Sequence, residues 1–127
     1  MGSTPKDRRA LIKENQIEQL KRMIEIREFE EICFNLFAEG LIRGTTHLCN
    51  GQEAVAVGIA SSLDVTDYVM CTYRGHGHAL ALGMTPETVL SEIMGKEGGS
   101  MNGLGGSMHL SDLSIGCLLY TSDAADE

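Results

Sequence analysis

A short strand-like segment, residues 67–73, lies between stretches of helical periodicity, and this order most constrains the fold. From Val69 to Tyr73 the side chains are apolar or strand-forming, without the alternation of a half-exposed strand. Such a run is typical of a strand covered on both faces of a parallel sheet. Parallel strands need crossover connections, which are usually helices. The sequence therefore predicts an α/β fold with a parallel sheet and flanking helices.

A long amphipathic helix is predicted before this strand. Its apolar residues recur at spacings of three and four, with charged residues between them: Leu20, Met23, Ile26, Phe29, Cys33, Leu36 and Phe37. Gly40 follows in the position that is favoured just beyond a helix C-terminus. We interpret the apolar stripe as a core-facing surface, with a partner-binding surface as the alternative.

Two further helices flank the strand. Residues 51–60 place small and apolar side chains on a helical pattern. After the strand, Thr85 is expected to cap a helix that starts at Pro86 and ends near Gly95. Residues 96–109 contain five glycines, so a loop is expected there. This loop lacks the setting of a dinucleotide-binding fingerprint, which must follow a strand and open a helix.

Three regions are expected along the chain. Residues 1–14 show little hydrophobic pattern and are predicted to be a mobile N-terminal segment. Residues 15–116 are predicted to form the α/β domain, which is expected to be incomplete. Residues 117–127 differ in pattern from everything before them, and we interpret them as translated sequencing adapter. The alternative for this tail is a genuine C-terminal strand with an acidic end.

Charge and composition argue against several classes of function. The net charge is -8 and the basic residues form no long run, so binding to nucleic acids or anionic membranes is not expected. No apolar stretch approaches the roughly 18 residues that cross a bilayer, and the first residues lack the apolar core of a signal peptide. A cytoplasmic protein is therefore expected. The four cysteines form no Cys-x-x-Cys pair, so we expect reduced thiols and no zinc site built from them.

Three polar residues are candidates for chemistry. Tyr73 and Arg74 end the predicted strand, and ligands bind at the carboxyl ends of strands in open α/β sheets. A phenol and a guanidinium there are suited to bind a phosphate group. From these two residues alone, an ordinary surface ion pair is an equally good interpretation. His47 lies in a polar turn, where a histidine either transfers protons or is simply solvated.

Four motifs are distinctive when they are taken in order: His47-Leu48-Cys49-Asn50-Gly51-Gln52-Glu53-Ala54, Thr72-Tyr73-Arg74-Gly75-His76-Gly77, Gly95-Lys96 and Gly105-Gly106-Ser107-Met108-His109. At these separations the chain resembles the alpha subunits of the thiamin-diphosphate-dependent pyruvate, acetoin and branched-chain 2-oxo acid dehydrogenases. The resemblance covers roughly residues 17–112. It implies the N-terminal part of a thiamin-diphosphate-binding fold. The complete protein is then expected to decarboxylate a 2-oxo acid oxidatively.

The resemblance also implies roles for individual residues. The family residues that match Tyr73 and Arg74 contact the cofactor diphosphate, and the histidine that matches His47 faces the substrate. His76 and His109 belong to matching motifs, and their roles stay open. The family holds Mg2+ with a Gly-Asp-Gly motif that this sequence lacks. No metal ligand is therefore named, and the Mg2+ ligands are expected further downstream.

Partners follow from the same resemblance. A beta subunit in a heterotetramer is expected to supply the glutamate that activates the cofactor, and a lipoyl-bearing acyltransferase component is expected to receive the acyl group. The 127 residues alone are therefore expected to be inactive. The substrate stays open between pyruvate or a related 2-oxo acid and acetoin. A small non-catalytic interaction domain is the alternative of a different class.

Overall fold

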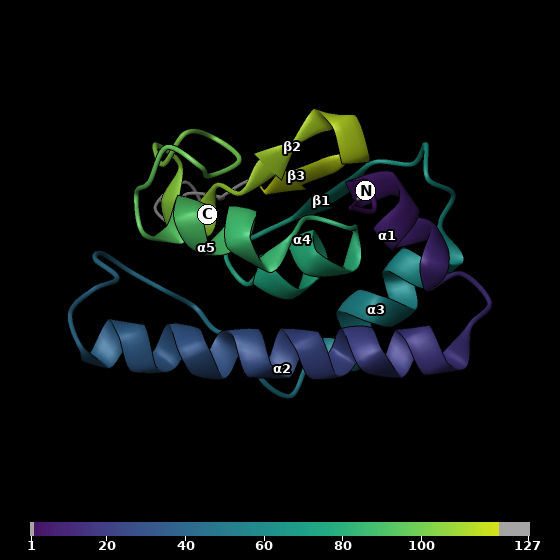
Figure 1. Cartoon of the computed structure of the whole chain (residues 1–127), viewed down its shortest axis with the longest axis horizontal. Helices are drawn as coiled ribbons and strands as arrows, with labels where there is room; N and C mark the ends of the chain where they lie inside the picture. The colour runs from purple at the N-terminus through teal and green to yellow at the C-terminus, as the bar shows by residue number, and fades with distance from the viewer. Residues whose placement is uncertain (1, 120–127) are drawn as a thin grey trace, which may run out of the picture.

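The computed structural model describes residues 2–119. Its elements in chain order are α1 (Pro5–Leu11), α2 (Gln16–Ala38), α3 (Glu53–Ser62), β1 (Val69–Cys71), α4 (His76–Ala81), α5 (Pro86–Ile93), η1 (Gly106–Met108), β2 (Ser111–Asp112), η2 (Leu113–Ile115) and β3 (Cys117–Leu119). Helix α2 runs along one side of the molecule and the sheet lies on the other side, with α3, α4 and α5 between them (Figure 1). None of the helices in this part of the chain combines the length and the apolar character that a membrane crossing requires.

The described residues form a sheet with the strand order β1–β3–β2. β1 pairs with β3 in parallel, with Val69 opposite Cys117, and β2 pairs with β3 in the antiparallel sense, with Asp112 opposite Cys117. Between β1 and β3 the chain passes through α4 and α5, so this parallel pair has the helical crossover that was expected. The predicted α/β arrangement is confirmed in part, because the sheet is small and mixed rather than wholly parallel.

Strand β1 is less covered than predicted. Its central residue, Met70, is 69% exposed, and the preceding Tyr68 is 65% exposed. Val69 and Cys71 pack against the core on the other face. The expectation of a strand buried on both faces is therefore wrong for residues 2–119, because helices cover only one face of β1 there.

Helix α2 follows the predicted stripe only in part. Ile26, Phe29 and Cys33 are buried as predicted, whereas Leu20 is 53% exposed and Phe37 is 47% exposed. The buried face is completed by the charged residues Arg22 and Glu30. Apolar residues lie on several sides of this helix, so helical periodicity alone could not select the buried side. The interaction partners of the buried side chains determine instead which side of this helix faces the core.

The N-terminal segment contains helix α1, which differs from the expected mobile segment. Thr4 and Asp7 form a capping box at its start, with Thr4 Oγ1 accepting from the Asp7 backbone N–H at 3.2 Å. The guanidinium of Arg9 is buried and donates to the carbonyl oxygens of Asp67 and Ile115 at 3.2 and 3.0 Å. A buried arginine rather than an apolar stripe anchors this helix, which is why hydrophobic pattern gave no sign of it.

Residues 117–119, which were assigned to the tail, form strand β3 in the middle of the sheet. Cys117 is fully buried and Leu119 is 4% exposed. Three apolar residues suffice to continue a parallel pairing with β1, whatever the origin of the segment. The remainder of the predicted tail, residues 120–127, lies outside the described residues, as does Met1.

Helix α5 begins as predicted. Thr85 Oγ1 accepts from the Thr88 backbone N–H at 3.3 Å, and Pro86 occupies the first turn. Val89 and Ile93 are buried on its inner side. The helix ends at Ile93, close to the predicted end.

Candidate functional site

The turn after β1 carries Tyr73 and Arg74 toward helix α4, which begins at His76. Gly75 caps this helix and is buried. A Cβ atom at position 75 would lie 1.9 Å from Leu119 Cδ2, so a residue without a side chain lets the turn pack closely on β3. The position of Tyr73 and Arg74 at the carboxyl end of β1 is thus fixed by contact with the sheet.

The structure brings together the three residues that were predicted to form the site. The rings of His47 and Tyr73 have their centroids 4.7 Å apart with an interplanar angle of 60°. The Arg74 guanidinium carbon lies 5.8 Å from the centroid of the Tyr73 ring. Arg74 Nη1 also donates to the carbonyl oxygen of Leu48, next to His47. The juxtaposition that the sequence predicted is therefore present.

The cluster of His47, Tyr73 and Arg74 is open to solvent. Tyr73 is 47% exposed, Arg74 is exposed and His47 is half-buried. Within residues 2–119, Arg74 forms no ion pair with an acidic side chain, so the surface ion pair that was the alternative interpretation is not formed there. An exposed guanidinium without an acidic partner, beside a phenol and an imidazole, is suited to bind an anion.

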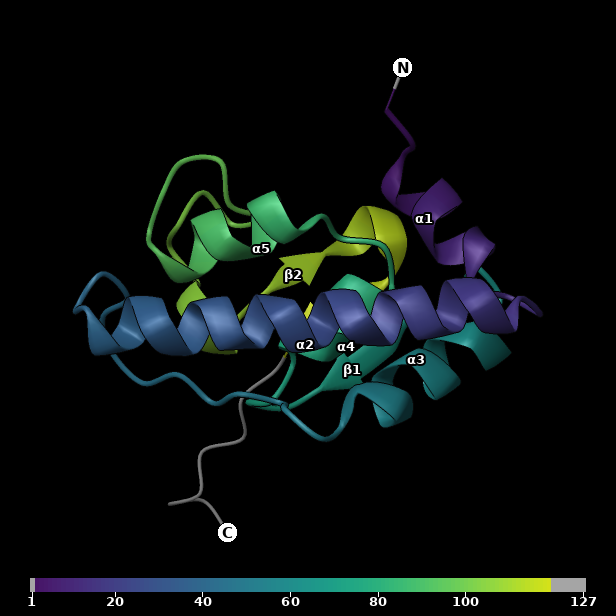
Figure 2. The same ribbon diagram turned by 60° about the horizontal axis from the view of Figure 1, so that its bottom comes forward.

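His47 lies on the loop between α2 and α3, which runs back along α2 (Figure 2). At the end of this loop, the carboxylate of Glu53 accepts from the Gly51 backbone N–H at 3.0 Å and from Arg27 Nε at 2.5 Å. The hydrogen bond from Arg27 lowers the pKa of Glu53 to about 2, although burial of the carboxylate acts in the opposite direction. Sequence reasoning missed this pair. Glu53 belongs to the first of the four motifs, but nothing in that motif indicates a partner 26 residues away in the sequence.

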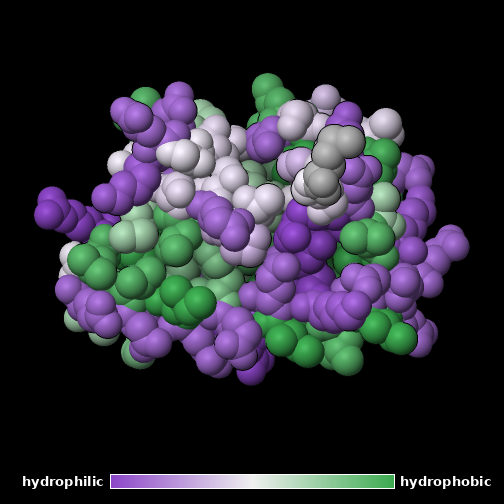
Figure 3. Space-filling model, in the orientation of Figure 1, coloured by the Kyte–Doolittle hydropathy of each residue, from purple (hydrophilic) through white to green (hydrophobic). Residues whose placement is uncertain are grey.

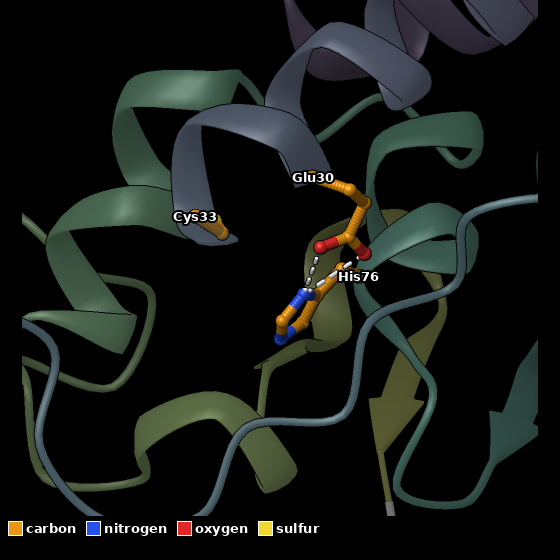
Figure 4. Close-up of side chains that lie close together, drawn as sticks. All are labelled: Glu30, Cys33 and His76. Atoms are coloured by element: carbon orange, nitrogen blue, oxygen red, sulfur yellow. Dashed lines mark hydrogen bonds and ion pairs between the residues drawn. The ribbon is translucent and has the colours of Figure 1, made fainter. Parts of the chain in front are cut away.

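A second polar network is wholly buried and centres on Glu30 of α2 (Figure 4). Both carboxylate oxygens lie 3.0 Å from His76 Nδ1, and His76 Nε2 lies 2.6 Å from Ser107 Oγ. The Cys49 thiol lies 3.1 Å from Glu30 Oε1. This network joins α2, the loop that carries His47, the start of α4 and η1. It assigns a structural position to His76, whose role the sequence left open.

A third buried carboxylate, Glu92 of α5, organises the glycine-rich loop. Its Oε2 accepts from the backbone N–H groups of Met101 and Gly103 at 2.7 and 2.9 Å, and its Oε1 accepts from those of Gly105 and Gly106 at 2.7 and 3.1 Å. Burial opposes ionisation, but these donors together lower the pKa of Glu92. The only sign in the sequence was an acidic residue on the inner side of a predicted helix.

The remaining candidate histidine, His109, follows η1 and is exposed. Its Nδ1 lies 3.2 Å from the carbonyl oxygen of Gly105. A hollow of about 500 Å³ lies between the end of α2 and the glycine-rich loop, where Arg43 and Lys96 contribute to its walls. None of His47, Tyr73 and Arg74 lines this hollow.

Comparison with known proteins identifies the family. The model of the dehydrogenase E1 component family matches residues 21–123, and the chain belongs to this family. The match covers the buried network, the cluster at the end of β1 and the glycine-rich loop. The resemblance that was drawn from the four motifs is thereby confirmed.

Individual relatives share almost half of the aligned residues. The chain is 46% identical over 108 residues to the alpha subunit of acetoin:2,6-dichlorophenolindophenol oxidoreductase from Cupriavidus necator, covering 85% of this chain and 32% of the relative. It is 43% identical over 109 residues to the subunit of the same name from Bacillus subtilis, covering 86% and 33%. It is 48% identical over 99 residues to the pyruvate dehydrogenase E1 component subunit alpha from Zymomonas mobilis, covering 77% and 28%. The chain thus spans about a third of the length of the curated relatives it matches.

Proposed function

We propose that this chain is the N-terminal part of an alpha subunit that binds thiamin diphosphate and acts on pyruvate or a related 2-oxo acid. The observation that carries the proposal is the juxtaposition of His47, Tyr73 and Arg74 at the carboxyl end of β1. Family membership and the names of the relatives support the same assignment.

The residues of this cluster fit one end of such a cofactor. Arg74 offers several N–H donors and a permanent positive charge to a diphosphate, and the Tyr73 hydroxyl adds a donor without charge. When it is bound, thiamin diphosphate supplies the carbon-bond chemistry. His47, beside the Tyr73 ring, is placed to donate a hydrogen bond or to move a proton at the substrate oxygen. In this proposal the ligands of Mg2+ lie in a segment beyond the present chain.

A beta subunit and a lipoyl-bearing acyltransferase are the partners in this proposal. Apolar side chains remain exposed on the outer side of α2 and α3: Ile17, Leu20, Ile24, Val55 and Ile59. Figure 3 shows apolar surface, interrupted by polar groups, along the side where α2 lies. Exposed apolar area of this kind marks a protein interface more often than a free surface, which supports a partner subunit there.

Acetoin is the second candidate substrate. Two relatives with high identity are named as acetoin oxidoreductase subunits, while others are named as pyruvate dehydrogenase subunits. The cluster contains nothing that separates the two, because both substrates would meet the same imidazole. We place the specificity contacts in the downstream segment and in the beta subunit.

The test is an assay of the complete reading frame, recovered from longer assembled DNA and co-expressed with its beta partner. We expect thiamin-diphosphate-dependent turnover of either pyruvate or acetoin, and the faster reaction identifies the substrate. The same DNA shows whether residues 117–127 are adapter, since genuine coding sequence would continue through them. A complete heteromer that turns over neither substrate would contradict the proposed function.

A further inference from the structure

We propose that Glu30, Cys33, His76 and Cys49 form a buried site for a zinc-like divalent cation. This site is separate from the cluster of His47, Tyr73 and Arg74. The four residues come from three parts of the chain: helix α2, the loop that follows it and the start of α4. Figure 4 shows Glu30, Cys33 and His76 projecting from two elements toward a common space. The proposal does not depend on the proposed function.

The donor atoms are already close to coordinating geometry. One atom each from Glu30, Cys33 and His76 lie within 4.8 Å of one another. The Cys49 Sγ lies 3.1 Å from Glu30 Oε1, which adds a fourth donor. Zinc bonds of roughly 2.0 to 2.3 Å require donors roughly 3.3 to 3.8 Å apart in a tetrahedron. Coordination therefore requires the Cys33 side chain to move closer to the Glu30–His76 pair.

The chemistry of the donors selects the ion. A carboxylate, an imidazole and two thiols form a mixed oxygen, nitrogen and sulfur set, which suits zinc and disfavours Mg2+ or Ca2+. The site is closed to water, because Glu30, Cys33 and His76 are fully buried and Cys49 is 3% exposed. The buried Glu30 carboxylate already accepts from the Cys49 backbone N–H at 3.3 Å, and a divalent cation would add positive charge beside it. Closed sites of this kind are structural rather than catalytic.

The surroundings also match those of a metal site. The second ring nitrogen of His76 lies 2.6 Å from Ser107 Oγ, so an N–H at this position has an acceptor and Nδ1 is left to coordinate. Glycine at position 77 makes room for the thiol, since a Cβ atom there would lie 2.8 Å from Cys49 Sγ. Cysteine spacing in the sequence gave no sign of this site, because the fold rather than a Cys-x-x-Cys motif assembles the donors.

Binding would exchange protons for the cation without oxidation or reduction. Coordination releases the protons of the Cys33 and Cys49 thiols to solvent as the two sulfur–metal bonds form.

The test uses cobalt and zinc as probes of the complete alpha subunit, co-expressed with its beta partner in medium that supplies one metal, the other or neither. We expect a stoichiometric metal complex, a thiolate-to-cobalt charge-transfer band and a higher melting temperature with zinc. Cys33→Ser and Cys49→Ser should each abolish the stoichiometric complex and change the cobalt spectrum. Cys71→Ser is the matched control, because Cys71 is a half-buried thiol outside the cluster, and it should leave both unchanged.

A milder variant keeps the test decisive where a ligand variant fails to fold. Ser107→Ala should weaken zinc binding roughly 10- to 100-fold, since it removes the acceptor of the second His76 nitrogen. The proposal is overturned if the parent chain gives no thiolate band with cobalt, or if it gains neither structure nor melting temperature with zinc. Equal zinc binding by the parent and by Cys33→Ser would overturn it as well.

Discussion

Single side chains determine how the loop that carries the candidate catalytic histidine is held. The Glu53 carboxylate accepts hydrogen bonds from the Gly51 backbone N–H and from Arg27 at the end of that loop. Earlier in the loop, the carbonyl oxygen of Leu48 accepts from Arg74. His47 directly precedes Leu48, the residue to which Arg74 is attached. At this scale the cluster is a positioned set of side chains, because Arg74 is attached to Leu48 and the Tyr73 ring lies against both His47 and Arg74.

Removing the imidazole should affect turnover more than cofactor binding. In the complete heteromer, His47→Asn should lower kcat by about 10²- to 10⁴-fold, which is the usual contribution of a positioned acid or base. Thiamin diphosphate affinity should stay within a few fold, since His47 is not assigned to the diphosphate. Steady-state kinetics with cofactor titration check this, with Arg43→Gln as a control outside the cluster. A variant that loses affinity and keeps kcat would refute the role.

The pair of Glu53 and Arg27 predicts a specific pH dependence of stability. The pKa of Glu53 is lowered from 4.5 to about 2, so its contribution is complete above about 4.5 and is lost as the pH falls toward about 2. Near neutral pH, Glu53→Gln should reduce the free energy of unfolding by about 1–3 kcal/mol. This difference should shrink on acidification. Urea unfolding at several pH values measures it, and Glu39→Gln, at an exposed glutamate, should show little change at any pH.

At the scale of elements, the glycine-rich loop owes its shape to α5. Four backbone N–H groups converge on the carboxylate of Glu92, so the loop wraps around the end of this helix. The sequence predicted both the helix and the loop, because Thr85, Pro86 and the glycines are local signals. It could not predict their attachment, which depends on one buried carboxylate facing residues that follow it by 9 to 14 positions.

Glu92→Gln should loosen this loop while leaving α5 intact. An amide presents an N–H₂ group to two of the four donors, so at least two hydrogen bonds are lost and the expected destabilisation is about 1–3 kcal/mol. Amide hydrogen exchange should become faster at Met101 and Gly103 or at Gly105 and Gly106, depending on which pair the new N–H₂ group faces. Exchange within α5 should change little. Glu87→Gln, at an exposed position of the same helix, is the control. Unchanged exchange in the loop would argue against this attachment.

At the scale of the whole molecule, segments distant in sequence lie against one another. Arg9 near the start donates to the carbonyl oxygen of Ile115 near the end, and Leu119 packs on the turn at Gly75. Sequence patterns predicted the class of fold and the cluster, because both follow from helix periodicity, strand composition and matching motifs. They missed α1 and kept a C-terminal strand only as the alternative for residues 117–127, since a buried arginine and a three-residue strand leave no hydrophobic period to detect.

Packing between the turn and β3 is open to a direct test. Gly75→Ala should destabilise the protein by about 1–3 kcal/mol, because its Cβ would overlap the Leu119 side chain. Gly58→Ala in α3 is the matched control, since a Cβ there meets nothing within 4 Å, and it should be neutral or slightly stabilising. Thermal unfolding compares the two. Equal effects would show that β3 does not pack on this turn.

The most direct test of the central claim is the calorimetric affinity of thiamin diphosphate, measured with its magnesium ion on the complete heteromer. Arg74→Ala should weaken binding by one to three orders of magnitude, because a charge-assisted contact to the diphosphate contributes about 1.5–3 kcal/mol and often more when it is bidentate. Tyr73→Phe should weaken it by a smaller factor. The control Arg43→Ala, outside the cluster, should bind as the parent does. Parent-like affinity in Arg74→Ala would contradict the assignment of a diphosphate site at the end of β1.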